Sequence, residues 1–228
     1  MKKYMLLLLL IPCWVSAQNR QIVEAASGED ISQKISAQMQ YLFPEFTNGD
    51  VFFKGHKSSG QLNYNMLLGE MHFLENNQVL TLSNVRDVMV AQIDNRRFYP
   101  YNSKEFTEEL MAAGNYQLRV RRKGNMAQHS KKGAYGGDTS TSSITSYSSI
   151  NSDNRQHSLT VQEKVLISLN YHYYLVGANG KHTLIKNVKT FTKQFPANRQ
   201  QIEDFVKNQN IRFNNEDDLR ALLEFCSK

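Results

Sequence analysis

The sequence predicts an α+β fold: an antiparallel β-meander or sheet with one inserted helix, and with C-terminal helices packed on it. Three observations lead to this prediction. Apolar and polar residues alternate in short runs between residues 50 and 120, turn-forming pairs separate these runs, and helical spacing of apolar residues is clearest after residue 198.

The first residues are typical of a secretory signal peptide. Two lysines precede an apolar run over residues 4–15, and Val15 and Ala17 stand where a signal peptidase requires small side chains. The run is shorter than the roughly 20 apolar residues that span a bilayer, although a retained anchor is the alternative. We expect residues 1–17 to be removed, leaving 18–228 as one compact exported domain without a transmembrane segment.

The composition indicates which class of partner the protein favours, but it does not indicate a reaction. The chain carries a net charge of +6, which falls to +4 once the two lysines of the signal peptide are removed. A mildly basic protein favours anionic partners, but net charge does not indicate a reaction. Cys226 is the only cysteine after the signal peptide, so the exported chain must be stabilised by its core.

The N-terminal lead-in, residues 18–43, is polar with apolar residues at helical spacing. An extended segment is the alternative, and Pro44 ends either one. The apolar positions of the predicted helix are Ile31, Ile35, Met39 and Leu42.

Residues 44–123 are predicted to form a β-rich half with one helix. Asn76-Asn77 and Asp94-Asn95 lie between strand-like runs and predict hairpin turns, because asparagine tolerates the left-handed conformation. His56–Gly60 predicts a further turn. The inserted helix is predicted over Ser103–Ala113, where Phe106, Leu110 and Met111 share a face, with Gly114 as its stop.

The remainder divides at residue 157. Residues 124–157 predict a flexible loop, since Ser and Thr fill nine of the eleven positions from 139 to 149. Residues 158–228 predict a strand hairpin that turns at Asn179-Gly180, followed by two helices capped by Asn198 and Asn215.

Glu70 and His72 are the densest pair of potential metal ligands, because alternate residues of a strand share a face. Glu75 would point to the opposite face, and no cysteine pair or histidine motif completes the set. We therefore expect ordinary polar side chains on a partly buried strand, with no bound metal and no cofactor.

A basic run is the second candidate site, and it contains no acidic residue. Nucleic acid is not the expected partner, because the run has no internal aromatic residue to stack on bases and the protein is exported. An anionic glycan or lipid head group is a more compatible ligand, and a solvated strand end is the alternative. The run comprises Arg119, Arg121, Arg122, Lys123, Lys131 and Lys132.

Tyr171, Tyr173 and Tyr174 could line an aromatic groove for a glycan or a peptide, although core residues with a polar tip are the alternative. No nucleophile motif of the Gly-x-Ser-x-Gly type is present, so a hydrolase would need a triad assembled from distant residues. Cys226 lies on the apolar stripe of the last predicted helix, where a buried hydrophobic role is expected rather than a reactive thiol.

Four segments of the chain, in this order, resemble a family of uncharacterised small exported proteins of Bacteroidota. The resemblance implies a Gram-negative cell envelope, in the periplasm or at the outer membrane, and it transfers no functional residue. The segments are Tyr41-Leu42-Phe43-Pro44-Glu45-Phe46, Leu62 to Met71, Ala134-Tyr135-Gly136-Gly137 and Asn215 to Cys226.

Together these observations predict an exported cell-envelope protein, periplasmic, outer-membrane associated or extracellular. The expected role is non-catalytic: an accessory protein that binds a ligand or an envelope protein partner. An exported hydrolase and a structural subunit of an envelope assembly are the two alternatives.

Overall fold

The computed structural model describes residues 20–25, 34–132, 138–139 and 163–227. The predicted signal peptide and nearly all of the Ser/Thr-rich stretch lie outside these residues. One twelve-stranded antiparallel sheet joins the strands of the described part. Its strands are β1 (Arg20–Ala25), β2 (Thr47–Phe53), β3 (Lys57–Asn65), β4 (Glu70–Glu75), β5 (Gln78–Thr81), β6 (Val88–Ile93), β7 (Arg96–Pro100), β8 (Phe106–Ala113), β9 (Tyr116–Lys132), β10 (Asp138–Thr139), β11 (Glu163–Gly177) and β12 (His182–Leu184).

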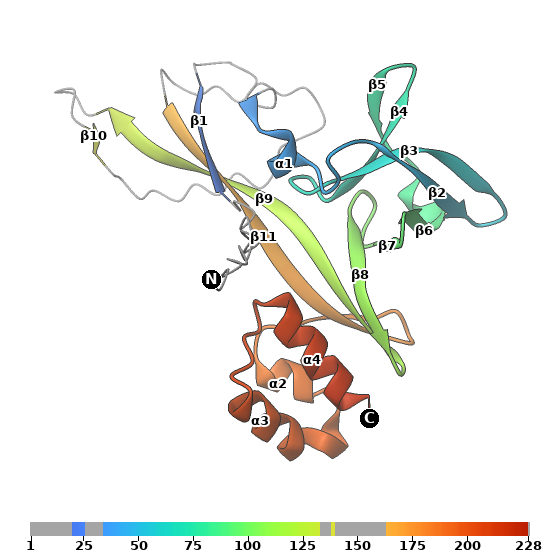
Figure 1. The fold of residues 1–228 in the computed structure, drawn as a ribbon, viewed down its shortest axis with the longest axis vertical. Helices are drawn as coiled ribbons and strands as arrows, with labels where there is room; N and C mark the ends of the chain where they lie inside the picture. The colour runs from blue at the N-terminus through green and yellow to red at the C-terminus, as the bar shows by residue number, and fades with distance from the viewer. Residues whose placement is uncertain (1–19, 26–33, 133–137, 140–162, 228) are drawn as a thin grey trace, which may run out of the picture.

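The sheet is built from two runs of consecutive hairpins. The strand order is β1-β11-β9-β8-β7-β6-β2-β3-β4-β5, so the runs β2–β5 and β6–β9 meet where β2 pairs with β6. β10 pairs with β9, and β12 pairs with β11. β9 and β11 are the longest strands, and they cross the molecule diagonally in Figure 1.

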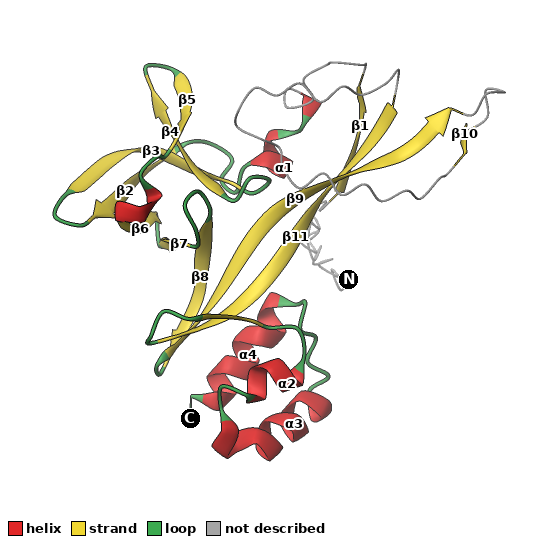
Figure 2. Cartoon of the chain, turned by 180° about the vertical axis from the view of Figure 1, so that it is seen from behind, coloured by secondary structure: helices red, strands yellow, loops and turns green. Residues whose placement is uncertain are grey.

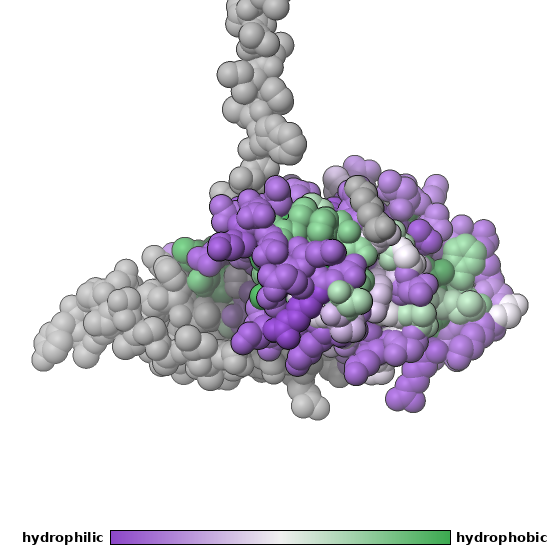
Figure 3. All heavy atoms as spheres, turned by 90° about the horizontal axis from the view of Figure 1, so that it is seen from below, coloured by the Kyte–Doolittle hydropathy of each residue, from purple (hydrophilic) through white to green (hydrophobic). Residues whose placement is uncertain are grey.

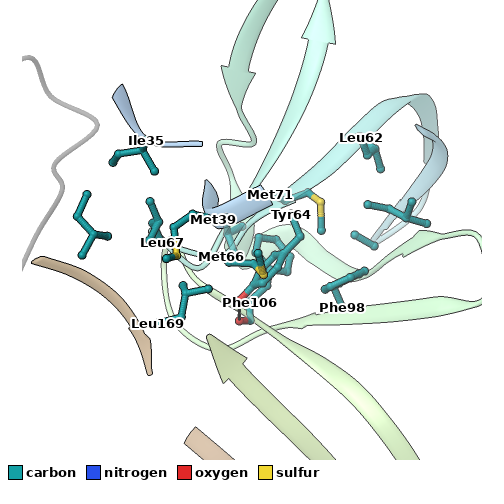
Figure 4. Close-up of a cluster of buried hydrophobic side chains, with 14 of the residues drawn as sticks. Ile35, Met39, Leu62, Tyr64, Met66, Leu67, Met71, Phe98, Phe106 and Leu169 are labelled. Carbon is teal, nitrogen blue, oxygen red and sulfur yellow. Dashed lines mark hydrogen bonds between the residues drawn. The ribbon is translucent and has the colours of Figure 1, made fainter. Parts of the chain in front are cut away.

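The two hairpin runs curl until β4 returns to β8. Glu70 and Glu105 are bridge partners, and the Phe106 N–H donates to the Gly69 carbonyl at 2.7 Å. The curl encloses a first core around Tyr64, Phe98 and Phe106, which are fully buried (Figure 4). The short helix α1 (Ala37–Gln40) adds Met39 to this core.

The C-terminal helices lie against one face of β9 and β11 (Figure 2), and a second core is packed between these helices and strands. Leu118 and Val120 from β9 pack there against Leu219, Leu222 and Leu223, all buried. The view in Figure 3, from below, is largely hydrophilic with separate hydrophobic patches, as expected of amphipathic helices whose polar faces point outward. The helices are α2 (Val188–Thr192), α3 (Arg199–Asn208) and α4 (Glu216–Cys226), with 3₁₀ turns at Val85–Asp87 and Pro196–Asn198.

The antiparallel sheet and the C-terminal helices were predicted correctly, but the inserted helix was wrong. Phe106–Ala113 is strand β8, paired with β7 on one side and β9 on the other. A register shift between Glu109 and Met111 places an extra residue in this strand. That bulge interrupts the two-residue alternation, and the resulting pattern has helix-like spacing in the sequence.

Local predictions had mixed outcomes. Asn76 and Asn77 both have positive φ in the β4–β5 turn, as predicted, and Gly180 has φ 72° in the β11–β12 turn. The predicted His56–Gly60 turn is wrong, because β3 begins at Lys57 and the chain reverses at Gly55, where φ is 100°. The predicted lead-in helix is reduced to α1, with the extended β1 before it.

Candidate functional site

The basic run of β9 is divided between two faces of the sheet. Val120 pairs with Tyr173 on the face that carries the second core, so Arg122 shares that inner face. Arg119, Arg121 and Lys123 therefore lie on the opposite, outer face. Lys131 and Lys132 also belong to β9, but their side chains lie outside the described residues.

Arg122 is a structural residue. It forms an ion pair with Glu108, and both side chains are buried, at 8% and 4% exposed. Arg96 approaches the other oxygen of Glu108, with Nε to Oε1 at 3.5 Å. Burial lowers the pKa of Arg122, but attraction to Glu108 outweighs it and the net shift is upward. The charge of Arg122 is already balanced by Glu108, so this side chain is not available to a ligand.

Arg121 and Lys123 on the outer face share one carboxylate. Glu105 accepts from Arg121 Nη2 at 2.8 Å and from Lys123 Nζ at 3.0 Å. Burial raises the pKa of Glu105, but these two hydrogen bonds outweigh it, so the net shift is downward and the carboxylate stays ionised. Arg121 Nε is buried with no hydrogen-bond partner in the described part of the chain.

Arg119 has the least complete set of partners. It is 8% exposed, its guanidinium lies 3.9 Å from the centre of the Tyr99 ring, and two of the five N–H groups of an arginine bond to Gln117 Oε1. Over the residues that the structure describes, it forms no ion pair. Its cross-strand partner on this face, Glu109, forms an ion pair with Arg97 at 2.9 Å, and Oε2 of Glu109 is buried without a hydrogen-bond partner in the described part of the chain. Burial lowers the pKa of Arg119 and outweighs the opposing attraction to Tyr99 and Glu109, yet an arginine remains charged.

Three aromatic rings complete the outer face beside these cations. The ring of Tyr101 lies 5.4 Å from Tyr174 and 5.3 Å from His182, and Tyr174 lies 5.8 Å from His182. The two tyrosine hydroxyls are 3.2 Å apart, and Arg121 lies 4.8 Å from the Tyr101 ring centre. We call the surface formed by Tyr99, Tyr101, Arg119, Arg121, Lys123, His172, Tyr174 and His182 the basic–aromatic face.

The predicted tyrosine cluster is split in the same way as the basic run. Tyr174 belongs to the basic–aromatic face, whereas Tyr173 packs in the second core. The guanidinium carbon of Arg122 lies 5.8 Å from the ring centre of Tyr171. Burial raises the pKa of Tyr173 to about 12. The three tyrosines therefore do not line one groove.

Both histidines of the basic–aromatic face have lowered pKa values, and burial is the main cause. Burial lowers the pKa of His172, and the charges of Arg121 and Lys123 lower it further. Burial also lowers the pKa of His182, with a further contribution from Arg119. Burial alone gives both shifts this sign, and the neighbouring cations add to them.

Glu70 and His72 lie together as predicted, and Tyr41 joins them. Tyr41 Oη is 3.1 Å from His72 Nδ1, and His72 Nε2 is 3.8 Å from Glu70 Oε2. Both of these facing atoms are buried without a hydrogen-bond partner. No group of three or more potential metal ligands occurs among the described residues, and no serine or threonine hydroxyl there is hydrogen bonded to His72.

Cys226 lies half-buried against the second core, and burial raises the pKa of its thiol to about 11. A thiol with a raised pKa is a poor nucleophile at neutral pH. No helix in the described ranges has the length and apolar character needed to cross a bilayer.

The sequence did not reveal Tyr99, Tyr101, Glu105 and His182 as parts of this site. Tyr99 and Tyr101 lie beside β9 only because β7, β8 and β9 are consecutive neighbours in the sheet. No protein-family model matches the chain, and neither a curated protein nor a solved structure matches it.

Proposed function

We propose that the protein is an exported, non-catalytic binding protein of the cell envelope, and that its basic–aromatic face binds an anionic ligand. One observation carries this proposal. Arg119 is a nearly buried cation whose polar partner is the neutral amide of Gln117, and it forms no ion pair in the described part. The carboxylate across the strand pair, Glu109, attracts Arg119 but forms its ion pair with Arg97. A buried charge is costly when an opposite charge only partly balances it, so this position favours an anion.

The neighbouring side chains support the same function. Arg121 and Lys123 share one carboxylate, so the row on β9 retains excess positive charge. The rings of Tyr99 and Tyr101 hold the two guanidinium groups by cation–π contact. Positioned guanidinium groups lose little freedom when they bind a carboxylate or a phosphate.

The hydrolase alternative has weaker support. It would use Tyr41, His72 and Glu70, but the hydroxyl bonded to His72 is the phenol of Tyr41 rather than a serine or threonine hydroxyl. The arrangement explains how the segment that contains Tyr41 is held against β4. It does not supply an activated nucleophile of the usual serine or cysteine type.

The test is elution from a heparin column in a salt gradient. The Arg119→Gln/Arg121→Gln variant should elute at clearly lower salt than the unmodified protein, because the binding row has lost two charges. The matched control, Lys193→Gln/Lys207→Gln, loses the same charge from exposed positions after the end of α2 and on α3, and it should elute close to the unmodified protein. Equal shifts in the two variants would show that only net charge matters, and the proposal would fail.

A further inference from the structure

We infer that the ligand of the basic–aromatic face is a linear acidic polysaccharide whose sugar units carry carboxylates. This inference rests on the proposed function and names its ligand class. The shape of the cation row, the rings beside it and the depth at which the charges lie all favour this ligand class.

The cations form a row rather than a point. Arg119, Arg121 and Lys123 are alternate residues of one strand, and a strand rises 3.2–3.4 Å per residue, so the row extends over about 13 Å. A single small anion would occupy one position in such a row. A chain molecule with repeating negative charges can occupy all of it.

The rings give the row a second chemical character. Tyr101 and His182 are partly exposed, and their mutual contacts with Tyr174 hold them in place at 5.3–5.8 Å between ring centres. Fixed aromatic surfaces offer apolar contact at little cost in side-chain freedom. The C–H faces of a sugar ring can use such surfaces while its carboxylate reaches a guanidinium group.

The depth of the charges favours a chain over a membrane surface. The side chain of Arg121 is 16% exposed, and Arg119 as a residue is 8% exposed. A bilayer is a broad surface that contacts protruding lysines and arginines first.

The guanidinium of Arg119 has the donors that a carboxylate needs. Only its Nε and Nη2 bond to Gln117, and in the described residues no other acceptor bonds to it. Its remaining N–H groups can donate to the oxygens of a uronic acid. The inference therefore requires both the charge of the carboxylate and the ring of the sugar.

The experiment is titration calorimetry of the purified protein with trigalacturonate, with its methyl ester, and with vesicles of phosphatidylglycerol and phosphatidylcholine. Trigalacturonate should bind saturably, and the uncharged ester should bind at least tenfold more weakly. Tyr101→Ala should weaken trigalacturonate binding severalfold, while Tyr101→Phe, which keeps the ring and loses the hydroxyl contact with Tyr174, should bind like the unmodified protein.

The other outcomes separate the two proposals. If trigalacturonate does not bind but vesicles do, and Arg119→Gln/Arg121→Gln abolishes vesicle binding, the polysaccharide inference is overturned and anion binding by this face stands. If Tyr101→Phe is as impaired as Tyr101→Ala, the ring has no role and the inference is also overturned. If no probe distinguishes the double arginine variant from Lys193→Gln/Lys207→Gln, both proposals fall.

Discussion

The two faces of β9 use the same residue type for opposite purposes. On the inner face, Arg122 is buried, is paired with Glu108 and lies over the ring of Tyr171. On the outer face, Arg119 and Arg121 lie against tyrosine rings with fewer anions than cations around them. Strand alternation thus divides one basic run into a structural half and a half that can bind a ligand.

The largest effect should come from the inner face. Arg122→Ala leaves Glu108 buried with only the more distant Arg96, and breaking a buried pair costs about 3–5 kcal/mol of unfolding free energy. Urea denaturation measures this loss. The matched variant Arg121→Ala should cost about 1 kcal/mol or less, because this pair is partly solvated and Glu105 keeps Lys123. Equal losses would contradict the division between the faces.

The next effect tests the packing of the inner face at Gly124. A Cβ atom there would lie 2.9 Å from Leu67 Cδ2 and 3.1 Å from Leu67 Cα, so the strand and the β3–β4 loop would have to separate. We expect Gly124→Ala to lower the unfolding free energy by about 1–3 kcal/mol. Gly60→Ala is the control, because no atom lies within 4 Å of its added Cβ, and its midpoint should hardly change.

The smallest effect concerns pH and the outer face. The folded-state pKa values of His172 and His182 are lowered from 6.5, so the unfolded chain takes up protons first as the pH falls through about 6.5. Stability should therefore decrease from pH 7.5 to pH 5.5 in the unmodified protein. The decrease should be smaller in His172→Asn/His182→Asn, measured by urea midpoints. An unchanged pH dependence would show that these histidines are not shielded by burial and the cation row.

The elements that depend on local chemistry were predicted correctly from the sequence. The Asn76-Asn77 turn depends on residues that accept positive φ, and the cap of α4 depends on Asn215, which accepts from the Asp218 N–H. The prediction of a helix at β8 was wrong, because a bulge gives this strand the apolar spacing of a helix. The short helix α2, with its Asn187–Thr190 capping box, was not predicted.

The cations of the candidate site could be predicted from the sequence, but the contacts that complete the site could not. Arg119, Arg121 and Lys123 are recognisable as a same-face set once their strand is identified, since they alternate. The contact of Tyr41 with His72 and that of Tyr101 with Tyr174 join residues distant in sequence. Such contacts depend on strand order and register, which no local pattern in the sequence specifies.

The most direct test of the account is an NMR titration of the ¹⁵N-labelled protein with trigalacturonate, following the Nε–Hε signals of the arginines. The account predicts saturable shifts at Arg119 and Arg121, with little change at Arg122 on the inner face. Shifts spread over exposed arginines of the C-terminal part, such as Arg199 on α3 and Arg212 in the loop before α4, with none at Arg119, would contradict it.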